Sequence, residues 1–236
     1  YRKFGWESAG RERTFVFDRG NSAFLPDHPE IDVTEDWHPH VAELVALHDA
    51  EPLAGHRSVE TFELLAQRKF GRVFVSTCAG AAIAYAGVSG TAVREYGGEP
   101  GNVASLLRHV FAELDDPSMP TSERPPGQRA TIEMTVITPD TATGLPGLLL
   151  DLGIPNMLDY VGMILILDAP GLFEGLGIRE VSIEPRDGRW RLLHGEDALE
   201  VTERELAKLV FGPERVPAFA PGVFPVDFFQ WPADRV

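Results

Sequence analysis

The chain has 236 residues, too many for one small domain and enough for one large or two modest ones. Apolar residues make up 44% of it, so a real core can be buried, and 23 glycines and 19 prolines are too few for a low-complexity chain. The formal net charge of −15 repels phosphate backbones and anionic lipid headgroups. Nucleic acid and membranes are therefore disfavoured as partners, and cationic or amine-bearing substrates are favoured.

The single cysteine, Cys78, has no partner for an internal disulfide. It lies in the strand-like run 73–78, where we expect a buried, inert thiol. No apolar stretch approaches the roughly 18 residues of a membrane span, and the N-terminus lacks a signal-peptide pattern. We therefore expect a cytoplasmic protein. Because the chain opens on structured-looking sequence without an initiator Met, we also expect it to be a piece of a longer protein.

The first part of the chain predicts one strand, a linker and two helices. The run 14–17 is a short strand, and residues 18–39, rich in Asp, Pro, Gly and His, are expected to form a linker. Apolar residues then recur at helical spacing over 41–48 and again over 59–66, where Ser58 is a candidate N-cap.

A three-stranded antiparallel meander is predicted next, over residues 72–78, 82–88 and 91–96. Asn102 is then expected to cap an amphipathic helix. The apolar positions of that helix are Val103, Leu106, Leu107, Val110, Phe111 and Leu114. A Pro- and Gly-rich surface loop is predicted for residues 115–128.

The remaining elements continue the mixture of helix and strand. Residues 130–138 predict a strand, 145–152 a short helix ended by Gly153, and 160–167 a buried strand. The segment 37–168 is therefore best described as α+β.

A smaller unit is predicted after Asp168. It consists of a helical turn, a hairpin and a helix that begins with the capping box Thr202–Glu205 and buries Leu206, Leu209 and Val210. The hairpin strands are expected over 178–184 and 189–193, and the helical turn over 172–176. The C-terminal tail carries Phe228, Phe229 and Trp231, whose exposure would forfeit roughly 1.5 to 3 kcal/mol each, so we expect them to be buried.

This order of elements resembles the GNAT acetyltransferase fold, a mixed and largely antiparallel sheet flanked by helices. The run Tyr1-Arg-Lys-Phe-Gly-Trp6 with the strand 14–17 resembles the end of a first GNAT domain. Residues 163–236 resemble the small sterol-carrier-protein-like unit of tandem acetyltransferases of the enhanced-intracellular-survival type. The resemblance implies three parts: residues 1–36 end a first GNAT domain and a linker, 37–168 form a second, degenerate GNAT-like domain, and 169–236 form the sterol-carrier-like domain.

The coenzyme-binding loop of the superfamily reads Arg/Gln-x-x-Gly-x-Gly/Ala, and its backbone N–H groups hold the coenzyme A pyrophosphate. The corresponding stretch here is Arg94-Glu-Tyr-Gly-Gly-Glu-Pro-Gly101. Glu95 and Glu99 place negative charge where a diphosphate would lie, and Pro100 removes an N–H donor. The resemblance therefore implies that acetyl-CoA is bound mainly by an upstream domain, and the coenzyme-binding residues of this chain stay unassigned.

Two candidate catalytic groups follow from the resemblance. Tyr1 matches the family's Tyr, which protonates the departing thiolate when an amine attacks the thioester directly. The C-terminal carboxylate of Val236 matches a chain end that reaches back to the first domain as a base. The alternatives are a half-buried structural Tyr and a plain docked tail.

Other residue clusters are weaker candidates. His28, His38 and His40 lack the Cys or carboxylate spacing that would complete a metal site, so none is expected. Two functions stay open. One is part of an N-acetyltransferase that transfers an acetyl group from acetyl-CoA to a small-molecule or peptide amine. The other is a non-catalytic module that binds a ligand or a protein. A homo-oligomer is compatible with both.

Overall fold

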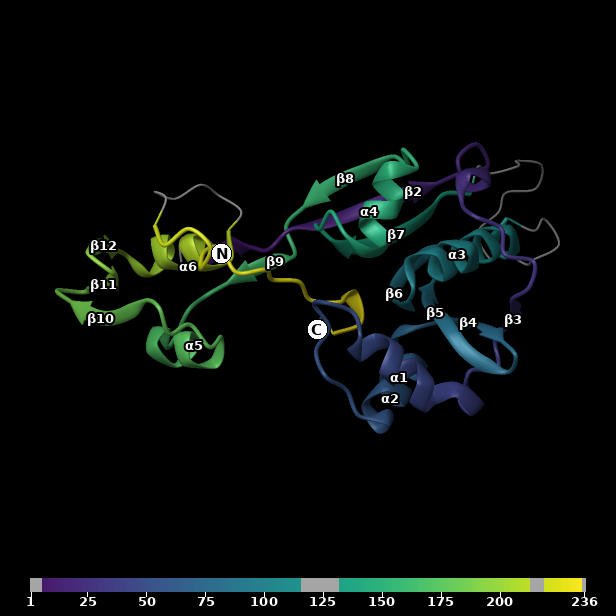
Figure 1. The fold of residues 1–236 in the computed structure, drawn as a ribbon, viewed down its shortest axis with the longest axis horizontal. Helices are drawn as coiled ribbons and strands as arrows, with labels where there is room; N and C mark the ends of the chain where they lie inside the picture. The colour runs from purple at the N-terminus through teal and green to yellow at the C-terminus, as the bar shows by residue number, and fades with distance from the viewer. Residues whose placement is uncertain (1–5, 116–131, 213–218, 235–236) are drawn as a thin grey trace. The chain divides into compact units, whose positions relative to one another are not determined.

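The computed structural model describes residues 6–115, 132–212 and 219–234. The chain divides into two compact units. The larger unit runs over residues 13–158 and includes the C-terminal residues from 230 onward, and the smaller unit combines the residues up to 12 with 159–229. Both units mix helices with largely antiparallel strands (Figure 1), which confirms the predicted α+β class.

A seven-stranded sheet forms the centre of the larger unit. In spatial order its described strands are β3 (Asp32–Thr34), β4 (Arg72–Cys78), β5 (Ala81–Ser89), β6 (Ala92–Gly98), β7 (Met134–Pro139), β2 (Glu12–Phe17) and β8 (Asn156–Asp159). Neighbours from β3 to β6 are antiparallel, which confirms the predicted meander. Strands β6 and β7 pair in parallel.

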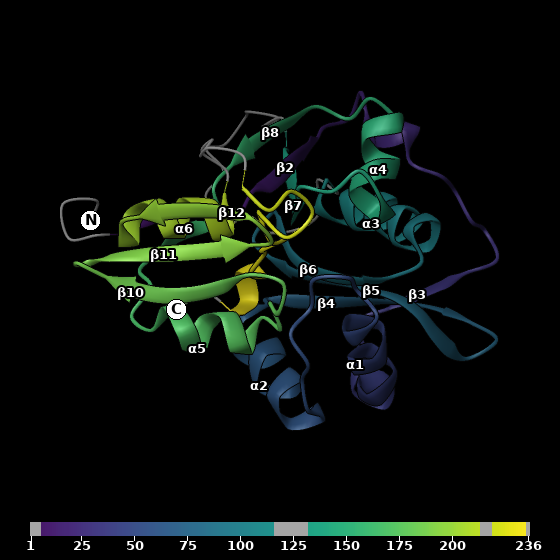
Figure 2. The same ribbon diagram turned by 60° about the vertical axis from the view of Figure 1, so that its left-hand side comes forward.

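The described α-helices of this unit cover both faces of the sheet. They are α1 (Val41–Asp49), α2 (Val59–Lys69), α3 (Pro100–Leu114) and α4 (Gly144–Asp151). Helices α1 and α2 lie on one side of β4 and β5, and α3 lies on the other (Figures 1 and 2). The Ser58 hydroxyl caps α2 by accepting the Thr61 N–H at 3.2 Å, as predicted.

Helix α3 begins three residues earlier than expected. Asn102 is not its cap, because Glu99 holds the N-cap position and Pro100 is the first helical residue. Proline suits that position, since its φ is preset for a helix and the missing N–H would have no intrahelical partner there. The predicted apolar face is confirmed, with Val103, Leu106 and Leu107 among its fully buried residues.

The smaller unit contains a three-stranded antiparallel sheet, β10 (Ser182–Arg186), β11 (Arg189–His194) and β12 (Asp197–Val201). A two-stranded antiparallel sheet joins β1 (Glu7–Ala9) to β9 (Gly162–Ile164). Its helices are α5 (Ala169–Gly175) and α6 (Glu203–Phe211). Figure 2 shows α6 and α5 beside the three-stranded sheet.

The capping box of α6 is present as predicted. Thr202 accepts the Glu205 N–H, and the Glu205 carboxylate accepts the Thr202 N–H at 2.8 Å. Leu206, Leu209 and Val210 are buried in the core of the smaller unit, which confirms the predicted face. Strand β12, which completes the sheet, was missed because its charged residues hide the alternation of a strand.

Three sequence predictions are wrong in part. The linker at 18–39 contains β3, because even this short edge strand finds backbone partners on β4. The strand expected over 160–167 shrinks to the three residues of β9, and Tyr160 and Leu167 are exposed, because β9 pairs only with the equally short β1. Cys78 is exposed because it ends β4 beside the turn at Ala79.

The compact units do not test the three-part division at residues 36 and 168. The two units are defined by contacts within the chain, whereas the three-part division follows from the resemblance to tandem acetyltransferases. It stays a prediction.

Candidate functional site

A cavity of about 450 Å³ lies in the larger unit where β6 ends and α3 begins. Its lining includes Leu47, Glu51, Ile83, Glu99, Pro100 and Leu145. The size lies within the range of small-molecule sites. The cavity is therefore our candidate functional site.

The pairing of β6 with β7 explains why this end of the sheet is open. Among the described residues, the pairs in register are Ala92↔Thr135 and Val93↔Val136, although both strands continue beyond these pairs. The cavity is lined by Gly98 at the far end of β6 and by Gly144 at the start of α4, the helix that follows β7. The opening therefore lies past the point where the parallel ladder has ended.

Gly98 makes the sharp exit from β6 that this geometry needs. Its φ is +128°, and a Cβ there would lie 2.5 Å from the carbonyl oxygen of Ile83. Any side chain would be strained in that backbone conformation and would clash with β5. Glycine is therefore required at the rim of the cavity.

Glu51, which follows α1, brings a carboxyl group into the cavity. Its Oε1 accepts the Gly98 N–H at 3.3 Å. Burial of this half-buried group raises its pKa to about 7, and the charge of Glu99 adds to the rise, while the bond from Gly98 opposes it. Glu51 can therefore gain or lose a proton near neutral pH.

The first turn of α3 is poorly suited to a diphosphate. The Gly98 N–H is already taken by Glu51, Pro100 has no N–H, and the exposed Glu99 adds a negative charge. A phosphate site at a helix N-terminus needs free N–H donors and a positive field. The expected departure from the coenzyme-binding pattern is therefore visible in the geometry at Glu99 and Pro100.

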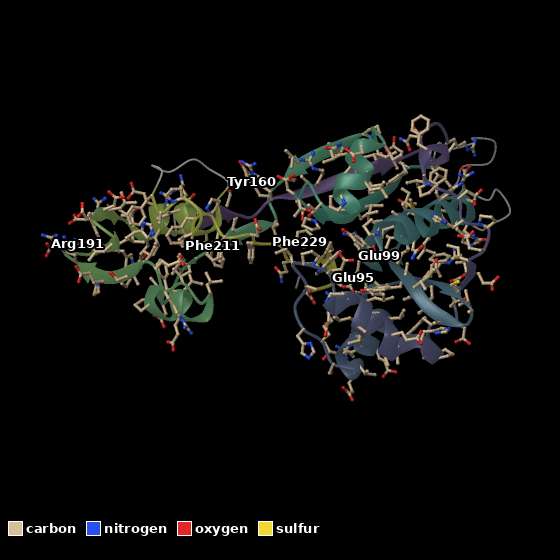
Figure 3. The ribbon with its side chains drawn as sticks, in the orientation of Figure 1. Glu95, Glu99, Tyr160, Arg191, Phe211 and Phe229 are labelled. Carbon is tan, nitrogen blue, oxygen red and sulfur yellow. The ribbon has the colours of Figure 1, made fainter. Side chains whose placement is uncertain are left out.

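Glu95 has a different place from the one expected. It lies on β6 (Figure 3), where it is fully buried and does not line the cavity. Its Oε1 accepts the Arg57 Nη1–H at 2.6 Å and the Tyr85 hydroxyl at 2.9 Å. Glu95 falls within the strand predicted over 91–96, but that prediction did not say which face its side chain would take, and β6 turns it inward.

Arg57 connects this buried pair to the C-terminal segment. Its Nη2–H donates to Asp234 at 2.7 Å. Burial alone would lower the pKa of Arg57, but the charge of Glu95 and its hydrogen bond outweigh that effect and raise it. The guanidinium is therefore a permanent cation shared by Glu95 and Asp234.

The aromatic tail is buried as predicted. Trp231 is 1% exposed and packs edge-on against Tyr96 in the larger unit, with ring centroids 4.9 Å apart. In the smaller unit, Phe229 is buried and the half-buried Phe228 packs on Phe211. The described C-terminal residues are thus docked on folded structure.

His48 is a buried neighbour of the same cluster. Its Nε2–H donates to the carbonyl of Gly55 at 3.1 Å, and Nδ1 lies 3.3 Å from the Tyr85 hydroxyl. Burial lowers the pKa of His48 despite the charge of Glu95, so the imidazole is neutral at pH 7. The imidazole of His48 therefore links the carbonyl of Gly55 to the Tyr85 hydroxyl without adding a charge.

Tyr1 and Val236, the two candidate catalytic residues, lie outside the described residues. The last residue described before Val236 is Asp234, held by Arg57. The catalytic roles of Tyr1 and Val236 therefore stay predictions.

The histidines considered for a metal lie apart in local contacts. The ring of His28 pairs with Glu30, that of His40 with Glu43, and His38 stacks on Trp37. Within residues 6–115, 132–212 and 219–234, no group of three or more His, Cys, Asp or Glu side chains is placed to hold a metal. In the same residues, no helix is both long enough and apolar enough to cross a membrane.

Sequence patterns missed Glu51 and Arg57, two charged residues that organise this region. Glu51 stands beyond the last turn of α1, and Arg57 stands in the connection to α2. No periodicity marks a charged residue in a connection as buried. The local signal for Glu51 was its place beside Pro52, which marks the end of the helix.

No protein family matches the sequence, and no curated protein matches it either. Solved structures do resemble the fold. A conserved protein of unknown function from Enterococcus faecalis, described as a probable N-acyltransferase, aligns with a TM-score of 0.52 and 11% identity, over 86% of this chain and 55% of its own.

Two further structures are GCN5-related N-acetyltransferases. That from Kribbella flavida aligns with a TM-score of 0.48 and 14% identity, over 88% of this chain and 57% of its own. The protein from Anabaena variabilis aligns with a TM-score of 0.48 and 13% identity, over 88% of this chain and 59% of its own. The chain thus spans between 55% and 59% of the length of these proteins. The likeness concerns the fold alone, a mixture of helices and largely antiparallel strands, as predicted.

Proposed function

We propose that this chain is part of a GNAT-type N-acetyltransferase that transfers an acetyl group from acetyl-CoA to an amine, in the cytoplasm. The observation that carries the proposal is the fold, which is shared with a probable N-acyltransferase. A fold alone does not set an activity, so the proposal depends on the chemistry described next.

In this proposal, acetyl-CoA binds mainly to a domain upstream of Tyr1. The turn at the start of α3 supports this division, because Glu51 occupies the Gly98 N–H and Pro100 offers none. A diphosphate placed there would meet the carboxylates of Glu51 and Glu99 and would have fewer N–H donors than the family's loop supplies. Residues 37–168 would then act as the degenerate second domain, and 169–236 as the sterol-carrier-like domain.

The reaction needs few protein groups. The amine attacks the thioester carbonyl, the C–S bond breaks, and the departing thiolate takes a proton. Tyr1 would supply that proton as a general acid, and the C-terminal carboxylate of Val236 would accept a proton from the amine. The acceptor would be a small-molecule or peptide amine, in keeping with the net charge of −15.

The test is Tyr1→Phe in the full-length protein, with release of coenzyme A as the readout. The change removes only the hydroxyl, so kcat should fall by about 10²–10⁴-fold with little change in acceptor KM. Tyr160→Phe is the matched control, because Tyr160 is exposed and has no assigned role, and it should keep full turnover.

An unchanged kcat in Tyr1→Phe, with a lowered melting temperature, would show that Tyr1 is structural. The sequence upstream of Tyr1 supplies an independent check. An Arg/Gln-x-x-Gly-x-Gly/Ala run between a strand and a helix is expected there. Without it, the alternative of a non-catalytic ligand- or protein-binding module is the better description.

A further inference from the structure

The cavity at the end of β6 has an unbalanced charge. Among the described residues that line it, the charged ones are Glu51 and Glu99, and none is Lys, Arg or His. Its remaining walls include apolar side chains such as Leu47, Ile83 and Leu145. Such a site has acceptors for a positive group and an apolar surface for a short hydrocarbon body.

The positive end of the α3 helix dipole opposes binding of a cation here. Its effective charge can be compared with the charges of the two carboxylates. A helix macrodipole amounts to roughly +0.5 charge at the N-terminus. Glu51 and Glu99 together carry two negative charges when both are ionised. The carboxylates therefore outweigh the dipole, even with Glu51 only partly ionised near neutral pH.

Among the described residues, the other groups shown to interact with Glu51 supply no positive charge. Besides Glu99, the titratable groups that interact with Glu51 are the phenols of Tyr85 on β5 and Tyr96 on β6. Burial raises the pKa of both phenols well above their ordinary value, so they are neutral. The nearby cation, Arg57, is bound to Glu95 and Asp234 instead.

We propose that this cavity binds an organic ammonium ion with a short apolar body, held by the carboxylates of Glu51 and Glu99. The Gly98 N–H keeps Glu51 in place at the rim, and the apolar walls take the hydrocarbon chain. The inference does not depend on the proposed transferase activity, because it concerns binding without any acyl donor.

The test titrates the full chain with n-hexylammonium chloride and, separately, with 1-hexanol, an uncharged analogue of the same length. Calorimetry gives the affinity, and the NMR shift of the Gly98 amide reports whether the ligand occupies this cavity. Hexylammonium should bind at least about tenfold more tightly than hexanol, the factor expected for one charge-assisted hydrogen bond. The Gly98 amide should shift on titration.

Glu51→Gln is the decisive variant, because it removes the charge but keeps the shape and an acceptor for the Gly98 N–H. It should weaken hexylammonium binding about tenfold and leave hexanol unchanged. Glu133→Gln, at an exposed site in the same unit, makes the same change in net charge and should alter neither affinity. This control separates a local effect from the general attraction of an acidic protein.

Affinity for hexylammonium should also rise between pH 6 and pH 8, as Glu51 ionises, while affinity for hexanol stays constant. If Glu51→Gln does not fold, the exposed Glu99→Gln replaces it, with an expected loss of about threefold. The proposal would be overturned if hexylammonium did not bind, or if it bound no more tightly than hexanol. It would also be overturned if the Gly98 amide did not shift, or if the folded variant bound hexylammonium as tightly as the wild-type chain.

Discussion

Two carboxylates lie along β6 in opposite electrostatic settings. Glu95, within the strand, is fully buried and paired with Arg57, which also holds Asp234. Glu51, at the end of the strand, faces a cavity with the like charge of Glu99 and no cation in its lining. Burial of the first carboxylate is balanced inside the chain. Burial of the Glu51 carboxylate is not balanced by a cation, as is typical of a group that binds a ligand.

The difference shows why a count of acidic residues near a loop is a poor guide to binding. Glu95 lies within β6, whereas Glu51 reaches the last residue of that strand, Gly98, from the end of α1. Glu95 forms a buried ion pair with Arg57. The ionised form of Glu51 is instead destabilised by burial and by the charge of Glu99. The two should respond in opposite directions when their charges are changed.

The largest effect is expected from breaking the balanced pair. Arg57→Met leaves the Glu95 carboxylate buried without its cation, which should lower the free energy of unfolding by about 3–5 kcal/mol. Urea unfolding measures it. The matched control is Arg191→Met. Arg191 lies in the smaller unit (Figure 3) and pairs with the exposed Glu184, so this change should cost less than about 1 kcal/mol. Equal losses would mean that the buried pair has no special role.

A smaller effect of opposite sign is expected at the cavity. The pKa of Glu51 is raised from 4.5 to about 7, so the folded state holds more protons than the unfolded state between these values. Stability from this group is therefore complete below pH 4.5 and falls as the pH rises to 7. Screened at a half-buried site, the loss is about 2 kcal/mol.

Glu51→Gln should remove that loss. The variant should match the wild-type chain near pH 4 and be more stable by about 2 kcal/mol at pH 8, as measured by urea unfolding at both pH values. Glu133→Gln should show no such difference between the two pH values. A destabilised Glu51→Gln at pH 8 would contradict the assignment of Glu51 as the unbalanced carboxylate.

The smallest expected signal comes from the coenzyme. Residues 1–236 alone should bind acetyl-CoA no more tightly than about 1 mM, because the Gly98 N–H is taken by Glu51, Pro100 offers no N–H, and Glu99 adds a negative charge. Calorimetric titration decides this. Micromolar binding would mean that the cavity accepts a diphosphate after all, and the contrast between the two regions of β6 would lose its meaning.

Local patterns in the sequence were sufficient for most elements of the fold. The meander, the apolar face of α3 and the capping box at Thr202 depend on side chains a few residues apart, and each was predicted correctly. Strand β3 and the exposure of Tyr160 could not be predicted in this way. They depend on which partner a segment meets far along the chain.

The site shows the same division more sharply. The sequence by itself determined that a Gly-rich stretch precedes α3, and it predicted that Glu99 and Pro100 make this stretch unsuited to phosphate. Only the tertiary structure decided that Glu95 turns inward to Arg57 and that Glu51 reaches Gly98 across 47 residues. Hydrophobic periodicity records which faces are apolar, but the partner of a charge is set by long-range packing and by the free energy of removing that charge from water.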